Sequence, residues 1–188
     1  GLWCSVLVRA GDVPRDRWAL VPIAAGLAAR AAIGGSGVDA VLKWPNDVMV
    51  ANSGEMRKLA GILVQAGAGD ALAVGIGINV SLRIDELPVP TATSITMSGG
   101  STDRALLLAQ LLAALSAQLE LWRSDPAALL AEFRERCVTL GKTVEVDLPD
   151  GRRVQGEAVD IDGHGHLVVE ASGKRETFSA GDVVHATI

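Results

Sequence analysis

Cysteine and clustered positive charge are both scarce in this chain. The only cysteines, Cys4 and Cys137, stand far apart without CxxC or Cys/His spacing, which excludes a disulfide framework and a cysteine-ligated zinc site and favours a reducing cytoplasm. Lys and Arg number 17 against 22 Asp and Glu, the formal net charge is -5, and no basic run occurs. Binding to nucleic acid or to an anionic membrane surface needs such clusters, so we predict neither.

Long apolar runs and phosphate-loop signatures are missing as well. No uninterrupted apolar stretch has the length of a membrane span, so we expect no membrane association. The GGSG segment at 34–37 lacks the Lys-Ser/Thr ending of a P-loop, and Gly75-Ile76-Gly77 lacks the third glycine of a dinucleotide-binding fingerprint. The chain starts at Gly1, directly in a strand pattern and without an initiator Met, so we expect that an upstream part is missing.

Apolar residues, by contrast, are plentiful enough for a core. Of the 188 residues, 49% are hydrophobic and the mean hydropathy is +0.32, which suits one medium domain with a small second one. Period-two alternation over residues 2–9 predicts a half-buried strand. Helical spacing from Pro14 to Ile33 predicts a helix packed in the core.

Polar side chains interrupt or end the strand-like runs between residues 43 and 79. They are Lys43, Asn46, Asp47, Lys58 and Asn79. Polar groups at the ends of core strands cost free energy unless something binds them. We therefore predict that the functional site lies in this stretch.

The pentapeptide Lys43-Trp44-Pro45-Asn46-Asp47 is the first of three motifs, and it has two interpretations. Pro45 stiffens the segment and favours extended geometry at Trp44. A carboxylate beside an amide and an ammonium suits a magnesium-bound polyphosphate, with Asp47 as a hard oxygen ligand and Lys43 as a source of positive charge. A plain β-turn, in which the Asn-Asp pair satisfies its own backbone, fits equally well.

The other two motifs combine a lysine with glycines inside strand patterns. Lys58 opens the strand-like run Lys58–Val64 and points either to solvent, as a protective edge lysine, or into a cleft. Gly61 favours the cleft, because a missing side chain lets a ligand approach the backbone. Gly75 and Gly77 lie two apart on one face of the next strand, which indicates a smooth slot for a flat ligand.

These three motifs, KWPND at 43–47, KLAGIL at 58–63 and GIGIN at 75–79, resemble in order and spacing the catalytic core of the biotin protein ligases. The resemblance runs over nearly the whole chain. It implies ATP-dependent activation of biotin to biotinyl-5'-AMP and transfer of the biotinyl group to a lysine of the biotin carboxyl carrier protein domain of an acetyl- or acyl-CoA carboxylase. It also implies ATP, Mg²⁺ and biotin as the small molecules bound.

The resemblance assigns roles residue by residue. Lys58 is the implied catalytic residue, which binds the biotin carboxylate and the α-phosphate. The implied biotin-binding residues are Lys58, Gly61, Leu63, Gly75 and Ile76. The implied ATP-binding residues are Lys43, Trp44, Asn46, Asp47 and Asn79, with Asp47 and Asn79 also at the metal.

One departure from the family pattern leaves alternatives open. The arginine-rich loop that closes over the adenylate, and an upstream Ser-Thr-Asn turn and Gln that bind biotin, normally precede the strand at residues 2–9 and are not among these residues. A lipoate-type ligase or transferase, which also joins a long acyl carboxylate to a lysine, is one alternative. An inactive fragment that binds biotin or its adenylate is the other.

Two helices are predicted after the three motifs. Thr91–Ile95 resembles a packing segment of the family. A helix capped by Ser101 or Thr102 runs to about Arg123, and a second begins at Asp125-Pro126 and ends at Gly141. The residues expected to face the core are Leu108, Leu111, Leu112, Leu115, Leu119, Trp122, Leu129, Leu130, Phe133 and Cys137.

Short strands separated by turn signals follow from Lys142 onward and predict a five-stranded barrel. The turn signals are Pro149-Asp150-Gly151, Asp162-Gly163, Ser172-Gly173 and Ala180-Gly181. By resemblance this barrel is the SH3-like C-terminal domain of the ligases, and His164, His166 and His185 are turn or surface residues. We therefore predict an α+β chain: a catalytic domain over 1–140, with a mixed sheet and packed helices like those of class II aminoacyl-tRNA synthetases, and an SH3-like barrel over 141–188.

Overall fold

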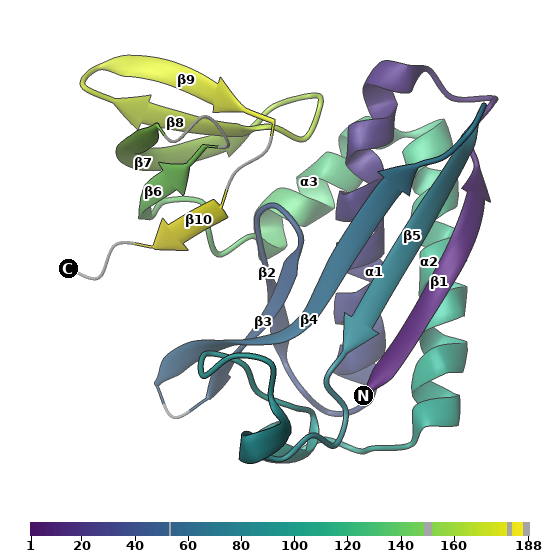
Figure 1. Cartoon of the computed structure of the whole chain (residues 1–188). Helices are drawn as coiled ribbons and strands as arrows, with labels where there is room; N and C mark the ends of the chain where they lie inside the picture. Colours follow the sequence, from purple (N-terminus) through teal and green to yellow (C-terminus); the bar gives the residue numbers. More distant parts are fainter. Residues whose placement is uncertain (53, 149–151, 180–181, 186–188) are drawn as a thin grey trace.

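The computed structural model describes residues 1–52, 54–148, 152–179 and 182–185, which form two five-stranded sheets and three α-helices (Figure 1). The first sheet has the order β1-β5-β4-β3-β2 and the second the order β10-β6-β7-β8-β9. The first sheet consists of β1 (Leu2–Arg9), β2 (Ala40–Lys43), β3 (Asp47–Asn52), β4 (Glu55–Ala66) and β5 (Ala71–Ile78). The second consists of β6 (Thr143–Asp147), β7 (Arg153–Ile161), β8 (Leu167–Ala171), β9 (Lys174–Phe178) and β10 (Asp182–His185). The α-helices are α1 (Val21–Gly35), α2 (Arg104–Ser124) and α3 (Pro126–Arg136), and short 3-10 turns lie at Arg15–Leu20, Ile84–Glu86 and Thr96–Ser98.

The strand pairings confirm the α+β class and correct one detail of it. Every pairing between named strands is antiparallel, whereas we predicted a mixed sheet. The reason is the connections: β2 to β5 follow one another through turns too short for a crossover helix, and antiparallel pairing is what such turns allow. The parallel contacts in the described residues are the isolated bridges Leu42–Cys137 and Lys58–Ala92.

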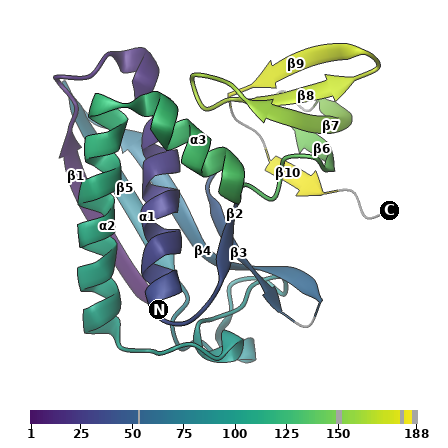
Figure 2. The same cartoon turned by 180° about the vertical axis from the view of Figure 1, so that it is seen from behind.

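Helices α1 and α2 cover one face of the first sheet and leave the other face without a helix (Figures 1 and 2). Strand side chains on the helix side, such as Ile62 and Val74, are buried. On the open side Leu63 is 62% exposed and Trp3 is 72% exposed. The predicted alternation in β1 is confirmed, because its odd-numbered residues face this open side. The functional stretch therefore lies on an accessible sheet surface.

The helices differ from the prediction at three ends. The predicted first helix begins with a 3-10 turn at Arg15–Leu20 before α1. Asp103, rather than Ser101 or Thr102, caps α2, since its carboxylate accepts from the Leu106 N–H at 3.0 Å. Helix α3 ends at Arg136, five residues before Gly141.

Most of the inward-facing residues predicted for α2 and α3 are buried, and two are not. Leu112 is 45% exposed, and Leu108 is only partly buried. Both flank the stripe of Leu107, Leu111 and Leu115 that contacts the core. The run from Leu106 to Leu108 contains no polar residue that would indicate its solvent-exposed side. The sequence therefore predicted more buried positions on this helix than the structure has.

Two helical segments, 15–35 and 104–124, are long and apolar enough to cross a membrane by length and composition alone. In the first, 61% of the most apolar window is buried inside the protein, and in the second 22%. Core helices that never enter a membrane meet the same criterion.

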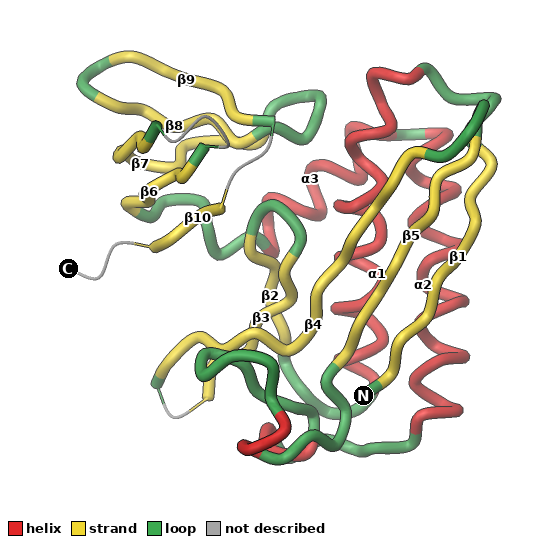
Figure 3. The backbone as a smooth tube through the Cα atoms, in the orientation of Figure 1, coloured by secondary structure: helices red, strands yellow, loops and turns green. Residues whose placement is uncertain are grey.

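The second sheet confirms the five short strands predicted after Lys142 (Figure 3). The turn signals at Asp162-Gly163 and Ser172-Gly173 join strands as predicted, and Ser172 and Gly173 both adopt positive φ. The turn signals at 149–151 and 180–181 lie outside the described residues. His164 is exposed, and His166 is partly exposed beside Asp162. The side chain of His185 lies outside the described part of the structure.

Candidate active site

A single row of residues crosses all five strands of the first sheet and places the three sequence motifs side by side. Lys43 pairs with Asp47, Asp47 with Gly61, Gly61 with Gly77, and Gly77 with Trp3. Directly paired residues present their side chains on the same face of a sheet. The strand register thus brings the motifs together. Gly61 and Gly77, in the middle of the row, have no side chains.

A β-bulge brings Lys58 onto this face. The register shifts between Val48 and Met49, so that Ala60 pairs with Val48, Lys58 pairs with Met49, and Leu59 is the extra residue. Lys58 and Gly61 are three residues apart, so in a regular strand they would face opposite sides of the sheet. The bulge therefore allows one strand to bury Leu59 and Ala60 while its lysine lies on the open face.

Lys58 lies along Gly61 and reaches the carboxylate of Asp47. The Lys58 Nζ is 2.5 Å from Asp47 Oδ1, and the two side chains are 41% and 19% exposed. Oδ1 is buried and gains no well-directed hydrogen bond from the described residues, so this contact is an ion pair without hydrogen-bond geometry. A Cβ added at Gly61 would lie 3.3 Å from Lys58 Cε. The absence of a side chain at Gly61 thus leaves room for the Lys58 side chain and also lets a ligand approach the backbone.

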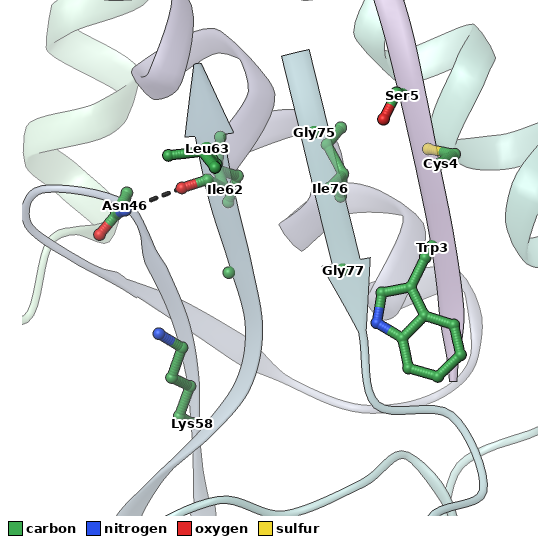
Figure 4. Close-up of a pocket in the computed structure, with 11 residues that line it drawn as sticks. Trp3, Cys4, Ser5, Asn46, Lys58, Ile62, Leu63, Gly75, Ile76 and Gly77 are labelled. Carbon is green, nitrogen blue, oxygen red and sulfur yellow. Dashed lines mark hydrogen bonds between the residues drawn. The ribbon is translucent and has the colours of Figure 1, made fainter. Parts of the chain in front are cut away.

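Two adjoining cavities share Lys58, Gly61, Gly77 and Trp3. The larger, about 270 Å³, lies over β4 and β5 (Figure 4). The smaller, about 170 Å³, lies where both strands meet the 79–92 loop. The other residues of the larger cavity are Cys4, Ser5, Asn46, Ile62, Leu63, Gly75 and Ile76. The other residues of the smaller one are Ala60, Asn79, Pro88 and Ala92.

Two polar residues predicted for the site lie at these cavities with their amides oriented by the backbone. Asn46 Nδ2 donates to the Ile62 carbonyl at 2.7 Å, and Asn79 Nδ2 donates to the Thr93 carbonyl at 3.0 Å. Because the nitrogens are used in this way, each amide presents its oxygen as the remaining acceptor. Ile76 lines the larger cavity although its side chain is 2% exposed and packs in the core.

Three other predicted residues line neither cavity. Lys43 and Asp47 belong to the row but stand at its β2 and β3 end. The Trp44 side chain is 2% exposed and turns into the core, where its indole N–H donates to the Gly165 carbonyl at 2.9 Å. The structure therefore separates Trp44 from the group around Lys58.

Sequence reasoning missed Trp3 and Ser5 as lining residues, whereas it placed Gly77 in the slot. The indole of Trp3 lies over Gly77, where an added Cβ would be 3.1 Å from Trp3 Cδ1 (Figure 4). The alternation in β1 places Trp3 and Ser5 on the open face, but only the pairing of β1 with β5 shows that this face adjoins the glycines. No local signal in the sequence specifies that pairing.

Cys4 lines the larger cavity without being suited to attack a substrate. Burial raises the pKa of its thiol, which lowers the thiolate fraction at neutral pH. Burial raises the pKa of the Cys137 thiol too, even though hydrogen bonds from Thr139 oppose the shift. The buried-hydrophobe interpretation of Cys137 is confirmed.

Two protein-family models and several known proteins match this chain. A model of the biotin/lipoate A/B protein ligase family matches residues 1–81, and a model of the biotin protein ligase C-terminal domain matches residues 139–186. The biotin–[acetyl-CoA-carboxylase] ligase of Mycobacterium tuberculosis is 40% identical over 186 residues, which cover 96% of this chain and 68% of that protein. The bifunctional ligase/repressor BirA of Bacillus spizizenii is 28% identical, and the match covers 96% of this chain and 57% of that protein.

Solved structures agree on the fold. The biotin protein ligase from Aquifex aeolicus in complex with biotin and ATP has a TM-score of 0.82 at 24% identity, over 98% of this chain and 78% of that one. The antiparallel sheet and the family model matched by residues 1–81 place the chain in the class of biotin and lipoate ligases. Within that class the chain belongs to the biotin protein ligase family.

Membership confirms the resemblance identified from the three motifs, together with the ligase class and the α+β fold with a small SH3-like unit. The lipoate-type alternative is not favoured, because the C-terminal match is to biotin protein ligases. The chain spans about two thirds of the Mycobacterium tuberculosis enzyme, at 68%, and 57% of the Bacillus spizizenii protein.

Proposed function

We propose that this chain carries the site at which biotin and ATP form biotinyl-5'-AMP and pyrophosphate, and from which the biotinyl group passes to a lysine of a biotin carboxyl carrier protein domain. The observation that carries the proposal is the position of Lys58. Its ammonium extends over a glycine floor where two adjoining cavities meet, with Asp47 holding its end. A cation between an acid site and a nucleotide site is what joining those two substrates requires.

The chemistry explains the need for that cation. In the first step a carboxylate oxygen of biotin forms a bond to the α-phosphorus of ATP, and the bond from that phosphorus to pyrophosphate breaks. Two anions approach each other, and charge builds up on the phosphoryl oxygens. The Lys58 ammonium stabilises both, since a fixed charge aimed at developing negative charge needs little reorganisation. In the second step the acceptor amine attacks the acyl carbon and AMP leaves.

The larger cavity suits biotin. Its floor is the backbone of Gly61 and Gly75, and Leu63 supplies an apolar wall. A Cβ added at Gly75 would lie 3.5 Å from the Leu63 carbonyl oxygen and 4.0 Å from the Leu63 Cβ, both ordinary contacts, so the absence of a side chain there leaves space above the strand instead of relieving a clash within the protein. A flat bicyclic ligand fits such a slot.

The smaller cavity and the 43–47 turn suit the nucleotide. Asn79 lines that cavity, and Asn46 and Asp47 lie where β3 begins, beside Lys58. We assign Lys43, Asn46, Asp47 and Asn79 to the phosphates. Covering both cavities keeps water from the mixed anhydride until the amine arrives.

The residues present also fit Mg²⁺. Asp47 supplies a carboxylate, the hard oxygen ligand that Mg²⁺ prefers, and its buried Oδ1 receives no well-directed hydrogen bond in the described part of the chain although it contacts the Lys58 ammonium at 2.5 Å. No group of three or more His, Cys, Asp or Glu that could hold a metal occurs among the described residues, and Mg²⁺ at phosphate sites uses only one or two carboxylates. Asp47, with the amide oxygen of Asn79, would hold it, and it would neutralise phosphate charge there.

The domain boundaries, the acceptor protein and the cellular location are also proposals. We assign the catalytic unit to residues 1–140 and the small SH3-like unit to 141–188, and we take the acceptor to be the carrier domain of an acetyl- or acyl-CoA carboxylase, by analogy with the name of the Mycobacterium tuberculosis relative. A cytoplasmic location fits two free cysteines, one of them buried.

Calorimetric titration of the 188-residue chain with biotin, lipoate and ATP tests the proposal. We expect binding of biotin and ATP, and no heat with lipoate. Binding of lipoate in preference to biotin would move the chain to the other branch of the class. Binding of biotin without ATP would make it a biotin-binding fragment.

A further inference from the structure

The loop of the second sheet between β7 and β8 packs against the first sheet's KWPND turn. Gly165 in this loop is buried at φ +83°, and an added Cβ would be 2.9 Å from both Leu20 Cδ2 and Ile23 Cδ1. Its carbonyl accepts the indole N–H of Trp44 at 2.9 Å. Only a residue without a side chain allows the loop backbone to approach this closely.

Asp162 shapes this loop through hydrogen bonds within it. The carboxylate accepts the backbone N–H groups of His164 and His166 at 2.8 and 2.9 Å, and the Gly165 N–H donates to the Asp162 carbonyl at 3.0 Å. The loop is thus shaped by its own residues before it contacts Trp44.

Trp44 has a second anchor outside its own sheet. Its backbone N–H donates to Thr139 Oγ1 at 3.1 Å, and Thr139 is completely buried in the segment that leads into the second sheet. Two donors of one residue, main chain and side chain, are therefore fixed by the C-terminal part of the chain. Pro45 follows directly and restricts the turn further.

The placement of this turn determines the placement of Asn46 and Asp47. Asn46 exchanges hydrogen bonds with Ile62, through its side-chain amide at 2.7 Å and its carbonyl at 2.9 Å. Asp47 then meets the Lys58 ammonium. A continuous set of contacts leads from Gly165 through Trp44 to the carboxylate and the lysine.

We propose that Trp44 and Gly165 are positioning residues, through which the second sheet sets the geometry of the phosphate-binding turn. The inference rests on the proposed function for the roles of Asn46 and Asp47. In this role the buried Trp44, which lines neither cavity, affects the site by holding Asn46 and Asp47 in place.

The test compares Trp44→Phe and Gly165→Ala with Gly163→Ala in the full chain. Gly163 lies in the same loop, and an added Cβ there meets nothing within 4 Å. In biotin-dependent exchange of pyrophosphate into ATP, we expect the first two variants to raise the KM for ATP at least about tenfold, since small misplacements of binding groups are costly. The KM for biotin should change less than the KM for ATP, because Gly61 and Gly75 are untouched and Asn46 is the one residue of the turn that lines the larger cavity. Gly163→Ala behaves as the parent. Equal KM for ATP in all four chains would overturn the inference.

A second readout needs no activity. In ¹H–¹⁵N spectra, the Asn46 side-chain amide and the Ile62 backbone N–H should shift in Trp44→Phe and Gly165→Ala but not in Gly163→Ala. Unchanged resonances would disprove the positioning role even in an inactive chain. Shifted resonances in a folded chain without exchange would support the positioning role and count against the proposed function, so the two failures are distinguishable.

Discussion

Lys58 combines a partly exposed side chain with a central place in the site, and this determines how its removal should act. We expect Lys58→Ala to slow biotin-dependent pyrophosphate exchange by about 10²–10³-fold, because it removes the charge that stabilises the transition state. Its free energy of unfolding should change by no more than about 1 kcal/mol, as is usual for a partly exposed ion pair. Thermal unfolding and exchange assays measure both. Equal exchange rates would remove Lys58 from its assigned role, and Lys174→Ala on β9 serves as the control.

A substitution at Gly75 should affect biotin binding without affecting the stability of the fold. We expect Gly75→Ala to leave stability nearly unchanged but to weaken biotin binding by roughly tenfold, because the added methyl narrows the slot. Gly67→Ala is the matched control: its Cβ would also lie 3.5 Å from a backbone carbonyl, that of Ala71, away from both cavities. Calorimetry should show weaker binding only for Gly75→Ala. Similar affinities in the two variants would place biotin elsewhere.

Asp47 tests the metal assignment. We expect Asp47→Asn to raise the Mg²⁺ concentration needed for half-maximal exchange, because an amide oxygen is a poorer ligand than a carboxylate. A titration with Mg²⁺ at saturating ATP measures this. An unchanged midpoint would count against metal binding at this residue.

Among the structural elements, the turn between β7 and β8 has a defined response to pH. Burial of the Asp162 carboxyl by itself raises its pKa, but the N–H groups of His166 and His164 that donate to it, and the nearby imidazoles, bring the net pKa below the ordinary 3.8. His166 Nδ1 lies 3.3 Å from this carboxylate. Because the folded-state pKa is lowered, the stabilisation is complete above the ordinary value and is lost as pH falls through the lowered one.

We therefore expect the acid limb of the stability curve to be less steep in Asp162→Asn than in the parent chain. Urea unfolding over a series of acidic pH values measures this. Parallel curves for the two chains would show that this carboxylate does not contribute to the acid limb.

The elements also show what the sequence could and could not predict. The strands, the helices α2 and α3, and the members of the three motifs follow from local period and turn chemistry. The bulge at Leu59 does not, because two consecutive buried residues there satisfy either face of a strand pattern, and the bulge depends on pairing with β3. The contact of Trp3 with Gly77 likewise depends on register between β1 and β5, which are distant in sequence.

Trp44 illustrates a further limit of local reasoning. The resemblance implied that Trp44 binds ATP, and in the structure its indole N–H donates to the carbonyl of Gly165, 121 positions later in the chain. The pentapeptide is in fact both a turn and a neighbour of the site. The two interpretations that the sequence left open are compatible, since the turn presents Asn46 and Asp47 while burying Trp44.

At the scale of the whole molecule, helices on one face of the first sheet leave the other face free for chemistry, and the second sheet contacts the edge where the KWPND turn lies. Family membership, the glycine floor and the lysine all point to one reaction. The chain spans 68% and 57% of the lengths of two relatives, so the reaction has to be measured on these 188 residues themselves.

Biotin-dependent exchange of labelled pyrophosphate into ATP by the 188-residue chain tests the central claim most directly. The account predicts exchange that requires biotin, is not supported by lipoate and disappears in Lys58→Ala. A folded chain that binds biotin and ATP but exchanges no label would contradict the claim that this sheet face forms the adenylate.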